Sequence, residues 1–582
     1  MVKSRKSTKF DLKRCALKRG TRPTHTIIAV PGQLDFRNML LVLLLSILLQ
    51  HQAATAERLK KGKKPHILFV LVDDYGWGNI GYHRPDDKGS EIRTPTLDKL
   101  AEEGIKLNRH YAGFSCSNIF YIAGTAPMCT PTRSALQSGR LPVHVQPSLA
   151  DPCARDCGVA REMTGIASKL EMGGYRTHQV GKWDAGMASF DHTPMGRGFN
   201  TSLNYFGHGN WMWTQAVWEG SYQNQTGIPS PGLTDLWDTD KPATDLNRTD
   251  FEEWIFRDRM KEIIEKHPDD EPLFLFYAPR IAHYPLQAPP EYQEEFMHIK
   301  EPHRRVYSAM VKVLDDQIKW LSNAFKEAGL WDDTLMVLSS DNGGFVGGVA
   351  ECDEIEASWM PKVGNGTSCF NLESGANNYP LRGGKYSSFE GGIRVNAFLS
   401  GGYIPETVRG TQQENMVTIS DWYATFCALA GVDPFDAKAA KAGLPPVDSI
   451  NLWPLLSGSN TTAPRAEYLV NANALVKDNW KLLKGRQVNS GWAGPRYPNV
   501  TSAGNEVGHV QLDCSESCLF DVANDPSEYE NVASKHPDIV AQLEARLKEL
   551  SATIIKKDKT KDPLCDETAR TKWGGFLGPW IE

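Results

Sequence analysis

The run His66-Ile67-Leu68-Phe69-Val70-Leu71-Val72 is followed directly by Asp73-Asp74. A continuous run of this kind is typical of a strand that is buried on both faces, as in a parallel sheet. Open α/β sheets bind their ligands at the carboxyl ends of such strands. Two adjacent carboxylates at that position suit a hard divalent cation such as Ca²⁺ or Mg²⁺, although a solvated Asp-Asp turn would have the same sequence.

Polar side chains also follow three later strand-like runs. In chain order these are residues 176–180 with Lys182 and Asp184, residues 272–277 with His283, and residues 334–340 with Asp341 and Asn342. The last pair and the first Asp-Asp pair together would give an oxygen cage for a hard cation, with room for a substrate oxygen. A surface lysine and a structural histidine are the alternatives for the other positions.

A second stretch carries a candidate nucleophile. It begins Cys129-Thr130-Pro131-Thr132-Arg133 and closes with Gly139-Arg140. Proline restricts the backbone just after the cysteine, and a helix that follows would direct its N–H groups and positive dipole end toward a bound anion. Arg133 adds a permanent cation. The bare pattern also fits an ordinary loop with a buried thiol.

A Gly-rich loop, residues 381–392, presents Lys385. Its glycines allow close approach of the backbone, and the lysine can bind an anion as a point charge.

Strand-like and helix-like segments alternate to about residue 440, which predicts an α/β fold with a large, mostly parallel mixed sheet flanked by helices. Residues 451–582 instead contain short strand-like segments and one helix near 536–551, which predicts a smaller antiparallel sheet plus a helix. The expected organisation is a leader (1–56), a catalytic domain (57–450) and a C-terminal subdomain (451–582). Further helices are expected near 161–172, 251–267 and 303–327, and after the Thr94 cap with Pro95 as the first helical residue.

The N-terminal segment indicates export. Residues 40–49 are apolar, Ala54-Thr55-Ala56 resembles a cleavage site, and the run is shorter than the roughly 20 residues of a spanning helix. A secretory signal peptide is therefore favoured over an uncleaved anchor, and no stable membrane span is expected. Residues 1–56 carry ten Lys+Arg and two Asp+Glu, so removing their net charge of +8 from the total of −6 leaves −14. So acidic a protein is a poor candidate for binding nucleic acid.

Eleven cysteines in an exported chain indicate disulfides. Local pairs are Cys153/Cys157, Cys352/Cys369 and Cys514/Cys518, and a pairing of Cys565 with Cys153 or Cys157 stays open. Cys427 is expected to be a buried free thiol. Six Asn-x-Ser/Thr sequons support a glycosylated luminal or secreted protein; they begin at Asn200, Asn224, Asn247, Asn365, Asn460 and Asn499.

The twelve-residue run from Cys129 to Arg140 resembles the signature of the type I sulfatases, in which the cysteine is oxidised to formylglycine. The order of motifs from about residue 65 to the Phe-Asp-Val-x-x-Asp-Pro segment at 520–526 is similar to that of the arylsulfatase B-like branch, within the alkaline-phosphatase-like superfamily. The resemblance implies a sulfuric ester hydrolase that acts on a sulfated carbohydrate or an aryl sulfate. It also implies maturation by the formylglycine-generating enzyme and a secreted or lysosomal location.

The resemblance also implies a role for each position. Asp73, Asp74, Asp341 and Asn342 match ligands of one Ca²⁺, and Cys129 matches the formylglycine nucleophile, which also contacts the metal. Arg133 matches the residue that steadies the formylglycine, Lys182 and Lys385 match lysines that hold the sulfate, and His283 matches a histidine near the leaving oxygen.

Two features depart from the family pattern. The family usually has histidine where this chain has Asp184, which we expect to serve as a base; Asp184→Asn should then slow turnover and leave the metal bound. Residues 113–126 form an apolar segment that the family lacks before its cysteine. The aromatic and Gly-rich stretch 195–215 suits a sugar-stacking wall as well as packed loops.

Two other functions compete with the sulfatase hypothesis. One is a phosphoester hydrolase of the same superfamily, which more often uses an unmodified nucleophile and two metals. The other is a secreted glycan-binding pseudo-enzyme in which Cys129 is never oxidised or residues 113–126 block the site.

Overall fold

The computed structural model describes residues 63–84, 91–113, 129–148, 150–217, 232–246, 250–346, 375–496 and 510–582. These residues fall almost wholly within one compact unit, Lys64–Glu582. That unit includes residues of both the predicted catalytic domain and the predicted C-terminal subdomain. The boundaries at residues 56 and 450 therefore stay predictions.

A ten-stranded mixed sheet forms the centre of the molecule, with the strand order β11-β2-β10-β9-β1-β8-β4-β5-β6-β7. The five strands β9, β1, β8, β4 and β5 are mutually parallel, whereas β10 and β6 run antiparallel to their neighbours β9 and β5. The strands are β1 (His66–Val72), β2 (Ile105–Leu107), β4 (Arg176–Lys182), β5 (Thr201–Tyr205), β6 (Trp237–Asp238), β7 (Lys241–Pro242), β8 (Leu273–Ala278), β9 (Thr334–Ser340), β10 (Ala397–Ser400) and β11 (Thr411–Gln413). This confirms the predicted α/β fold class.

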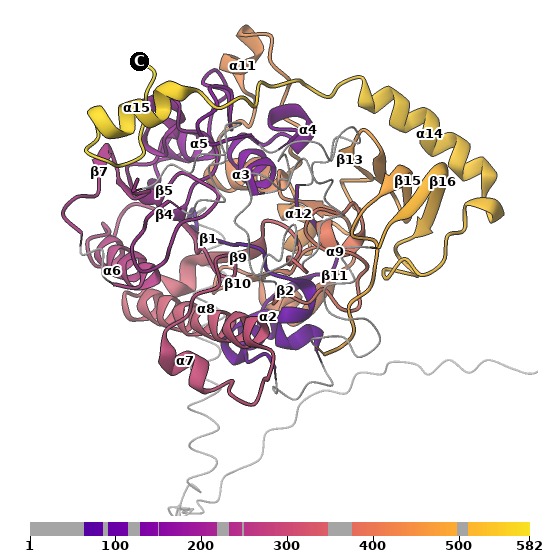
Figure 1. Cartoon of the computed structure of the whole chain (residues 1–582), viewed down its shortest axis with the longest axis horizontal. Coiled ribbons are helices and arrows are strands. Elements are labelled where there is room, and N and C mark those ends of the chain that lie inside the picture. The colour runs from indigo at the N-terminus through magenta and orange to yellow at the C-terminus, as the bar shows by residue number, and fades with distance from the viewer. Residues whose placement is uncertain are drawn as a thin grey trace, which may run out of the picture. The chain divides into compact units, whose positions relative to one another are not determined.

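Strand β1 shows why the sheet is covered on both faces. Ile67, Phe69 and Leu71 pack into one core, and the alternate side chains Leu68 and Val70 pack into another. Side chains of a strand point alternately to opposite faces, so an uninterrupted apolar run needs two covering layers. Helices α3, α5 and α10 supply the first layer, and α2, α6 and α8 supply the second. Figure 1 shows α6, α8 and α2 on one side of β1 and β4, and α3 and α5 on the other.

The helices agree with the predicted segments within a few residues. Helix α5 begins later than expected. Thr94 is the N-cap residue of α2 and Pro95 begins the helix, as predicted, but the Thr94 side chain bonds elsewhere: its Oγ1 accepts a hydrogen bond from Gly81 N at 2.8 Å and donates to Asp98 Oδ1 at 3.1 Å. The α-helices are α2 (Pro95–Glu102), α3 (Cys129–Ser138), α4 (Pro142–Val145), α5 (Ile166–Met172), α6 (Glu252–Glu265), α7 (Pro290–Glu294), α8 (Pro302–Glu327), α9 (Glu390–Ile393), α10 (Asp421–Ala430), α11 (Ala437–Lys441), α12 (Trp453–Leu456), α14 (Pro537–Ser551) and α15 (Pro563–Thr571).

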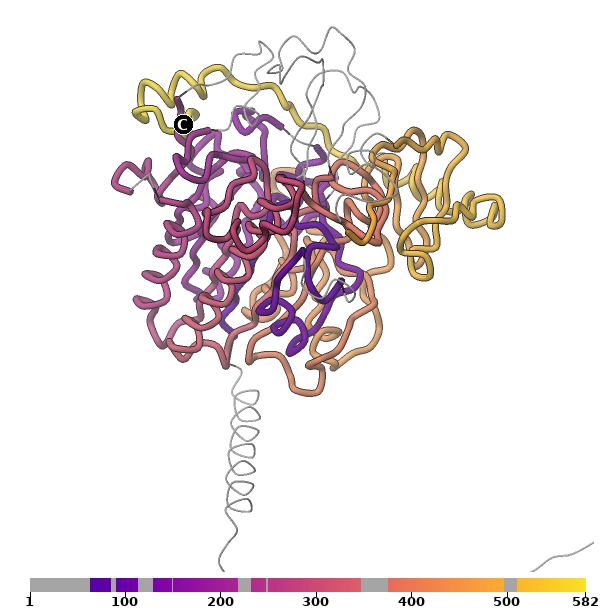
Figure 2. The backbone as a smooth tube through the Cα atoms, turned by 60° about the horizontal axis from the view of Figure 1, so that its bottom comes forward, coloured from indigo at the N-terminus to yellow at the C-terminus, as the bar shows by residue number. Residues whose placement is uncertain are grey.

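A separate four-stranded antiparallel sheet has the order β13-β14-β15-β16 and packs against α14, as predicted for the C-terminal part. Its strands are β13 (Glu467–Asn471), β14 (Ala474–Lys477), β15 (Trp480–Gln487) and β16 (Leu512–Asp521); a short parallel pair joins β3 (His110–Tyr111) to β12 (Val417–Thr418). Lys481 of β15 is fully buried, and its Nζ lies 2.8 Å from Glu390 of α9 and 2.9 Å from Glu528. This buried ion cluster fixes the small sheet beside the loop that carries Lys385. Figure 2 shows the chain leaving this sheet and crossing the molecule to its C-terminus.

Two disulfides are present among the described residues. Cys153 pairs with Cys565, and Cys514 pairs with Cys518. The local Cys153/Cys157 pairing is therefore wrong, because the side chain of Cys153 is joined to the C-terminal helix region instead, which leaves Cys157 buried and free. Cys427 is buried and free, as expected. Cys352 and Cys369 lie outside the described residues, as does nearly all of the segment 113–126.

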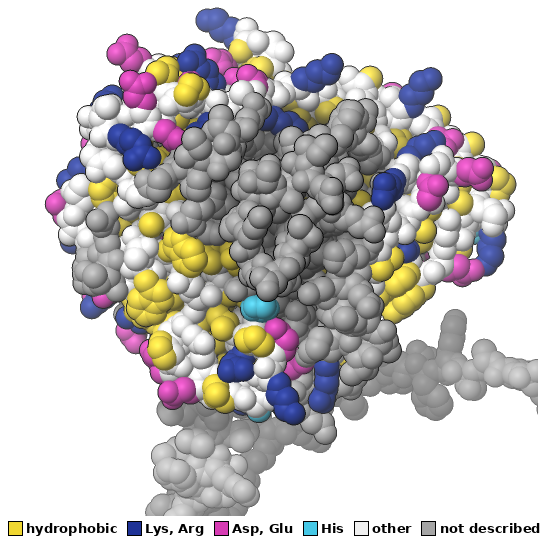
Figure 3. All heavy atoms as spheres, in the orientation of Figure 1, with side chains coloured by type: hydrophobic (Ala, Val, Ile, Leu, Met, Phe, Trp, Pro, Cys, Tyr) yellow, Lys and Arg dark blue, Asp and Glu magenta, His cyan; other side chains and the backbone are white. Residues whose placement is uncertain are grey.

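The described surface carries both signs of charge. Lys/Arg and Asp/Glu side chains are interspersed over the described part of the face in Figure 3. Among the described residues, no helix combines the length and apolar character that crossing a membrane requires.

Candidate active site

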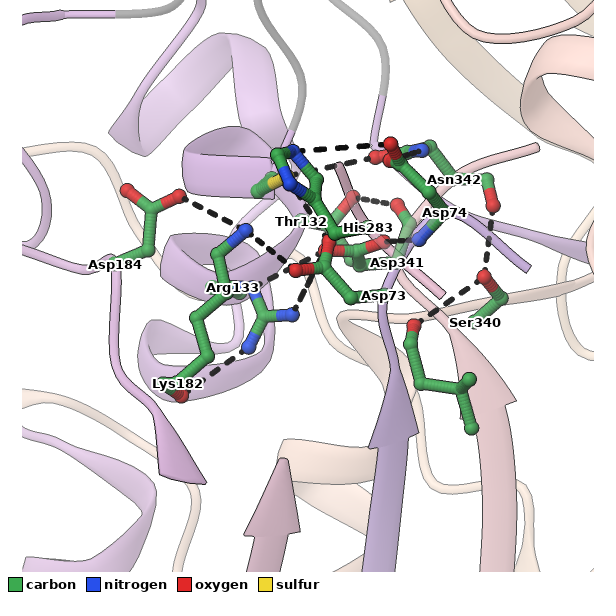
Figure 4. Close-up of polar contacts among 12 residues, drawn as sticks. Asp73, Asp74, Thr132, Arg133, Lys182, Asp184, His283, Ser340, Asp341 and Asn342 are labelled. Atoms are coloured by element: carbon green, nitrogen blue, oxygen red, sulfur yellow. Dashed lines mark hydrogen bonds and ion pairs between the residues drawn. The ribbon is translucent and has the colours of Figure 1, made fainter. Parts of the chain in front are cut away.

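Asp73 and Asp74 meet Asp341 and Asn342 because β1 and β9 pair in register, from His66 opposite Thr334 to Val72 opposite Ser340. The next residues on each strand therefore emerge side by side, as Figure 4 shows. All four side chains are buried. Asp341 Oδ1 accepts a hydrogen bond from the backbone N–H of Asp74 at 3.2 Å, and Asn342 Nδ2 donates to Asp74 Oδ1 at 2.7 Å.

Cys129 is the first described residue of helix α3 and faces this group of oxygens. Its Sγ lies 3.3 Å from Asp73 Oδ1 and 3.9 Å from Asn342 Oδ1. Pro131 occupies the first turn, where a proline costs no intrahelical hydrogen bond. Gly139 closes the helix with φ +68°, and a Cβ at that position would lie 2.6 Å from the Tyr423 ring. At the other end of α3, the contact of Cys129 with Asp73 holds the helix N-terminus against the carboxyl edge of the sheet.

Arg133 lies one turn along α3 and points into the same site. Its Nε and Nη2 donate to Asp341 Oδ2 at 3.1 and 2.8 Å, and its Nη1 donates to the Lys182 carbonyl at 3.2 Å. The guanidinium therefore joins the ends of β4 and β9. Thr132 adds a hydrogen bond from its Oγ1 to the Asp341 carbonyl, a contact that the sequence reading missed.

The two predicted lysines bind two different carboxylates. Lys182 Nζ, from the last residue of β4, lies 2.7 Å from Asp73 Oδ2. Lys385 Nζ, from the loop before α9, lies 2.7 Å from Asp74 Oδ2. Both ammonium groups are buried, so Lys182 is not the surface lysine that was the alternative for its position.

His283 follows β8 and completes the group. Its Nε2 lies 3.7 Å from Asp74 Oδ2, and its Nδ1 is hydrogen-bonded to the Tyr284 carbonyl. Burial, followed by the charges of Lys385 and Lys182, lowers the pKa of His283 well below 6.5, so the imidazole is neutral in the substrate-free site.

Asp184 lies beside the site and holds two partners that the sequence reading missed. Its Oδ1 accepts a hydrogen bond from Thr130 Oγ1 at 2.7 Å, and its Oδ2 lies 3.0 Å from His208 Nδ1. Burial alone would raise the pKa of Asp184, but His208 lowers it below the usual value through its charge and its hydrogen bond. The only sequence signal for His208 was its place in the aromatic, Gly-rich stretch after the β5 run.

Three residues of the site adopt left-handed backbone conformations. These are Asp74 (φ 52°), Asp184 (φ 45°) and Tyr386 (φ 76°), which is next to Lys385. Non-glycine residues rarely adopt positive φ, and such strain is concentrated at functional sites. Here it occurs at two carboxylates and next to one lysine of the site.

Buried carboxylates give the site a strong preference for positive charge. Burial and the neighbouring Asp341 raise the pKa of Asp73 to about 8. Burial also opposes ionisation of Asp341, but Arg133 and Lys182 keep the pKa of Asp341 below its usual value. The thiol of Cys129 is not activated as a nucleophile. Burial and the charges of Asp341 and Asp73 raise its pKa well above 9.

The donor set fits a hard divalent cation. One atom each from Asp73, Asp74, Cys129 and His283 lie within 4.8 Å of one another, and the amide oxygen of Asn342 borders the same space. Carboxylate and amide oxygens are the ligands that Ca²⁺ and Mg²⁺ prefer. Asp341 has its Oδ2 bound to Arg133, so only its Oδ1 faces the other ligands. A cation here would also relieve the cost of burying the Asp73 charge.

Comparison with known proteins places this arrangement in a family. Residues 65–432 match the family model described as Sulfatase. The chain is 31% identical to mouse (Mus musculus) arylsulfatase J over 542 residues, which covers 89% of this chain and 81% of that protein. It is 26% identical to human (Homo sapiens) N-acetylgalactosamine-6-sulfatase over 411 residues, or 67% of this chain and 66% of the relative.

The crystal structure of Ps i-CgsB in complex with k-i-k-neocarrahexaose has the same fold, with a TM-score of 0.64 at 23% identity over 88% of this chain and 99% of that one. Together, the fold, the site and the family match define a sulfuric ester hydrolase. The chain belongs to the sulfatase family, as a type I sulfatase of the alkaline-phosphatase-like superfamily.

Proposed function

We propose that this sulfatase hydrolyses sulfate esters of a carbohydrate or an aryl alcohol, with formylglycine made from Cys129 as its nucleophile and one bound Ca²⁺. The observation that carries the proposal is the position of Cys129 Sγ, which lies 3.3 Å from Asp73 and within 4.8 Å of Asp74. Each of these carboxylates binds a buried lysine at 2.7 Å. Cationic groups around a nucleophile suit an anionic ester, because they stabilise charge that develops on the sulfuryl oxygens.

The setting of Cys129 argues for modification of the residue. A neutral, buried thiol whose pKa is raised is a weak nucleophile, because the thiolate is the reactive form. When formed, the hydrated formylglycine supplies one hydroxyl as a nucleophile and a second from which the aldehyde is recovered. Maturation by the formylglycine-generating enzyme and passage through the secretory pathway, to a secreted or lysosomal destination, belong to the same proposal. The disulfides support an oxidising compartment.

Asp73, Asp74, Asp341 and Asn342 would hold the cation together with the modified residue 129. Bound there, Ca²⁺ supplies positive charge next to the sulfuryl oxygens. Lys182 and Lys385 would then turn from Asp73 and Asp74 toward the sulfate group of the substrate. Arg133 keeps Asp341 oriented through its two-pronged contact.

His283 and Lys385 are the candidates for protonating the leaving alcohol. Lys385 carries a proton in the substrate-free site, because Asp74 outweighs the effect of burial and raises its pKa well above 10.5. The neutral His283 would gain a proton as an anionic ester enters and offsets the charges of the two lysines. Either group would deliver the proton to the ester oxygen as the sulfur–oxygen bond breaks.

A substrate panel tests the proposal. Protein from a eukaryotic secretory host is incubated with aryl sulfates and a series of sulfated saccharides, and free sulfate is measured; the matching aryl phosphate is assayed in parallel. We expect sulfate release and much slower phosphate release. Faster hydrolysis of the phosphate would identify a phosphoesterase instead.

Mass spectrometry of the peptide that contains residue 129 tests the nucleophile. We expect the aldehyde or its hydrate in place of the thiol. An unmodified thiol in protein from the native host, with no sulfate release from any substrate, would favour a glycan-binding pseudo-enzyme.

A further inference from the structure

Each carboxylate oxygen of Asp184 has a hydrogen-bond partner. Thr130, the neighbour of Cys129, donates to Oδ1 at 2.7 Å, and His208 Nδ1 lies 3.0 Å from Oδ2. An ionised carboxylate can only accept hydrogen bonds, so Nδ1 of His208 carries the proton in this pair. The side chain of Asp184 is 1% exposed and that of His208 is 12% exposed, so solvent water competes little with the contact.

His208 is held in place by the loop that follows β5. The backbone N–H groups of Phe206 and Gly207 each donate to a different oxygen of Asp235 at 2.8 Å. On the other side of His208, Asn210 Nδ2 donates to Glu252 Oε1 at 2.6 Å. These buried contacts fix the backbone on both sides of the histidine, so the imidazole loses little further freedom when it bonds to Asp184.

The same carboxylate oxygen lies close to a lysine of the site. Lys182 Nζ is 3.9 Å from Asp184 Oδ2 and 2.7 Å from Asp73 Oδ2. Both carboxylates are buried, and attraction between opposite charges is strong where water is excluded. Without a donor at Oδ2, Asp184 would compete with Asp73 and with any bound anion for the ammonium group of Lys182.

We propose that His208 is a positioning residue of the active site: by donating its Nδ1–H to Asp184, it keeps Lys182 directed toward the anion position. The inference rests on the proposed function, because it assigns that position to the sulfate group. It also gives a physical reason why aspartate can stand beside this anion site. The carboxylate is satisfied by His208 and Thr130, and so it does not withdraw the lysine.

Sulfate affinity of the full chain tests this role without catalysis. The chain is produced with Cys129 unmodified, and binding of inorganic sulfate is measured by isothermal titration calorimetry in Ca²⁺-containing buffer. We expect His208→Ala to weaken binding about ten-fold or more, the effect of losing one hydrogen bond to a charged group. We expect Asp184→Asn, and also the double variant His208→Ala/Asp184→Asn, to bind sulfate nearly as tightly as the wild type, because an amide does not attract Lys182.

The recovery in the double variant separates positioning from packing. If His208→Ala binds sulfate as well as the wild type, or if Asp184→Asn does not restore the lost affinity, the inference is wrong. If the unmodified wild type binds no sulfate and the matured protein hydrolyses no sulfate ester, the proposed function fails instead.

A matched pair of variants decides the question if His208→Ala does not fold. Asparagine at position 208 keeps a donor near the Nδ1 position, whereas glutamine keeps more of the volume but moves its amide away from it. We expect His208→Asn to retain sulfate affinity and His208→Gln to lose it, with equal thermal midpoints. Equal affinities of the two variants would overturn the inference.

Discussion

At the level of single residues, each of three buried cations around Cys129 pairs with its own carboxylate. Lys182 pairs with Asp73, Lys385 with Asp74, and Arg133 with Asp341. Three cations face three carboxylates, of which Asp73 holds its proton up to about pH 8, so the substrate-free group carries little net charge. Addition of a divalent cation would make it net positive, which is the charge that an anionic ester needs. In the proposed function, a bound cation would compete with the lysines for Asp73 and Asp74 and so free the ammonium groups for the substrate.

Lys385→Ala tests this pairing. The substitution removes a cation from a site closed to solvent and leaves Asp74 without its ammonium partner. We expect kcat/KM for an aryl sulfate to fall about 100- to 1,000-fold, as for the loss of one donor to a developing negative charge. Lys261→Ala is the control, because that side chain is 60% exposed and pairs with Glu265 on the surface of α6. A decrease of less than ten-fold in kcat/KM for Lys385→Ala would show that this lysine does not help to bind the sulfate group.

At the level of elements, the sequence predicted the strands that carry the site. The segments that became β1, β8 and β9 are apolar runs, each followed within a few residues by a polar side chain, and parallel strands bring such ends to one edge of the sheet. Asp73, Asp341 and His283 were therefore expected to meet. Helices α6, α8 and α14 were also expected, because each has a long apolar stripe.

Other elements could not be predicted, for physical reasons. Strands β2, β10 and β11 are three or four residues long, too short to show a periodic pattern, and they owe their pairing to tertiary contacts. His208 follows a five-residue strand without a motif of its own, and its partner Asp184 is 24 residues away. The sequence left a pairing of Cys565 with Cys153 or Cys157 open. The structure contains Cys153–Cys565, a choice that spacing along the chain could not make because the pair spans 412 residues.

Removal of the metal tests the proposed cation site where the ends of β1 and β9 meet. Dialysis against a chelator should abolish sulfate release and lower the thermal midpoint, because Asp73 and Asp74 lose the charge that compensates their burial. At a Ca²⁺ concentration about 100 times Kd, binding stabilises the folded state by about 2.7 kcal/mol. Differential scanning calorimetry before and after addition of Ca²⁺ measures the gain.

Two variants assign that calcium effect to the site. Asp74→Asn should reduce the gain in thermal midpoint, whereas Asp245→Asn should leave it unchanged because the Asp245 side chain is 85% exposed. Full activity after exhaustive chelation, with no bound metal by elemental analysis, would refute the calcium proposal.

The disulfide at the start of α15 gives a second prediction at this scale. Cys153–Cys565 closes a loop of 412 residues, so its removal should destabilise the fold by about 2–5 kcal/mol. The double variant Cys153→Ser/Cys565→Ser should unfold at lower denaturant concentration and expose α15 to proteolysis. Cys514→Ser/Cys518→Ser is the matched control, because its loop spans four residues and constrains the unfolded chain far less. Equal losses of stability in the two double variants would contradict the explanation that Cys153–Cys565 stabilises the fold by closing a long loop.

At the level of the whole molecule, buried ionisable groups determine how stability depends on pH. Burial raises the pKa of Glu252 to about 8 and those of Glu253 and Glu528 to about 7. Burial acts in the opposite direction on six histidines, whose pKa values lie below 6.5 in the folded state: His83, His110, His178, His192, His267 and His283. Below about pH 6.5 the unfolded chain therefore binds protons at histidines that stay neutral when folded, so acid favours unfolding.

Above about pH 6.5 the carboxyl groups dominate, and stability should fall as the pH rises. Folded Glu252 keeps its proton to about pH 8, whereas the unfolded chain has already released it, so each added pH unit favours unfolding by up to about 1.4 kcal/mol per such group. We expect the thermal midpoint to decrease between about pH 6.5 and pH 8. Glu252→Gln should reduce that decrease, because the amide can still accept the hydrogen bond from Asn210 without titrating. Glu265→Gln should leave the pH dependence unchanged because its side chain is 64% exposed, and a thermal midpoint that rises over this range would show that these carboxyl groups are ionised in the folded protein.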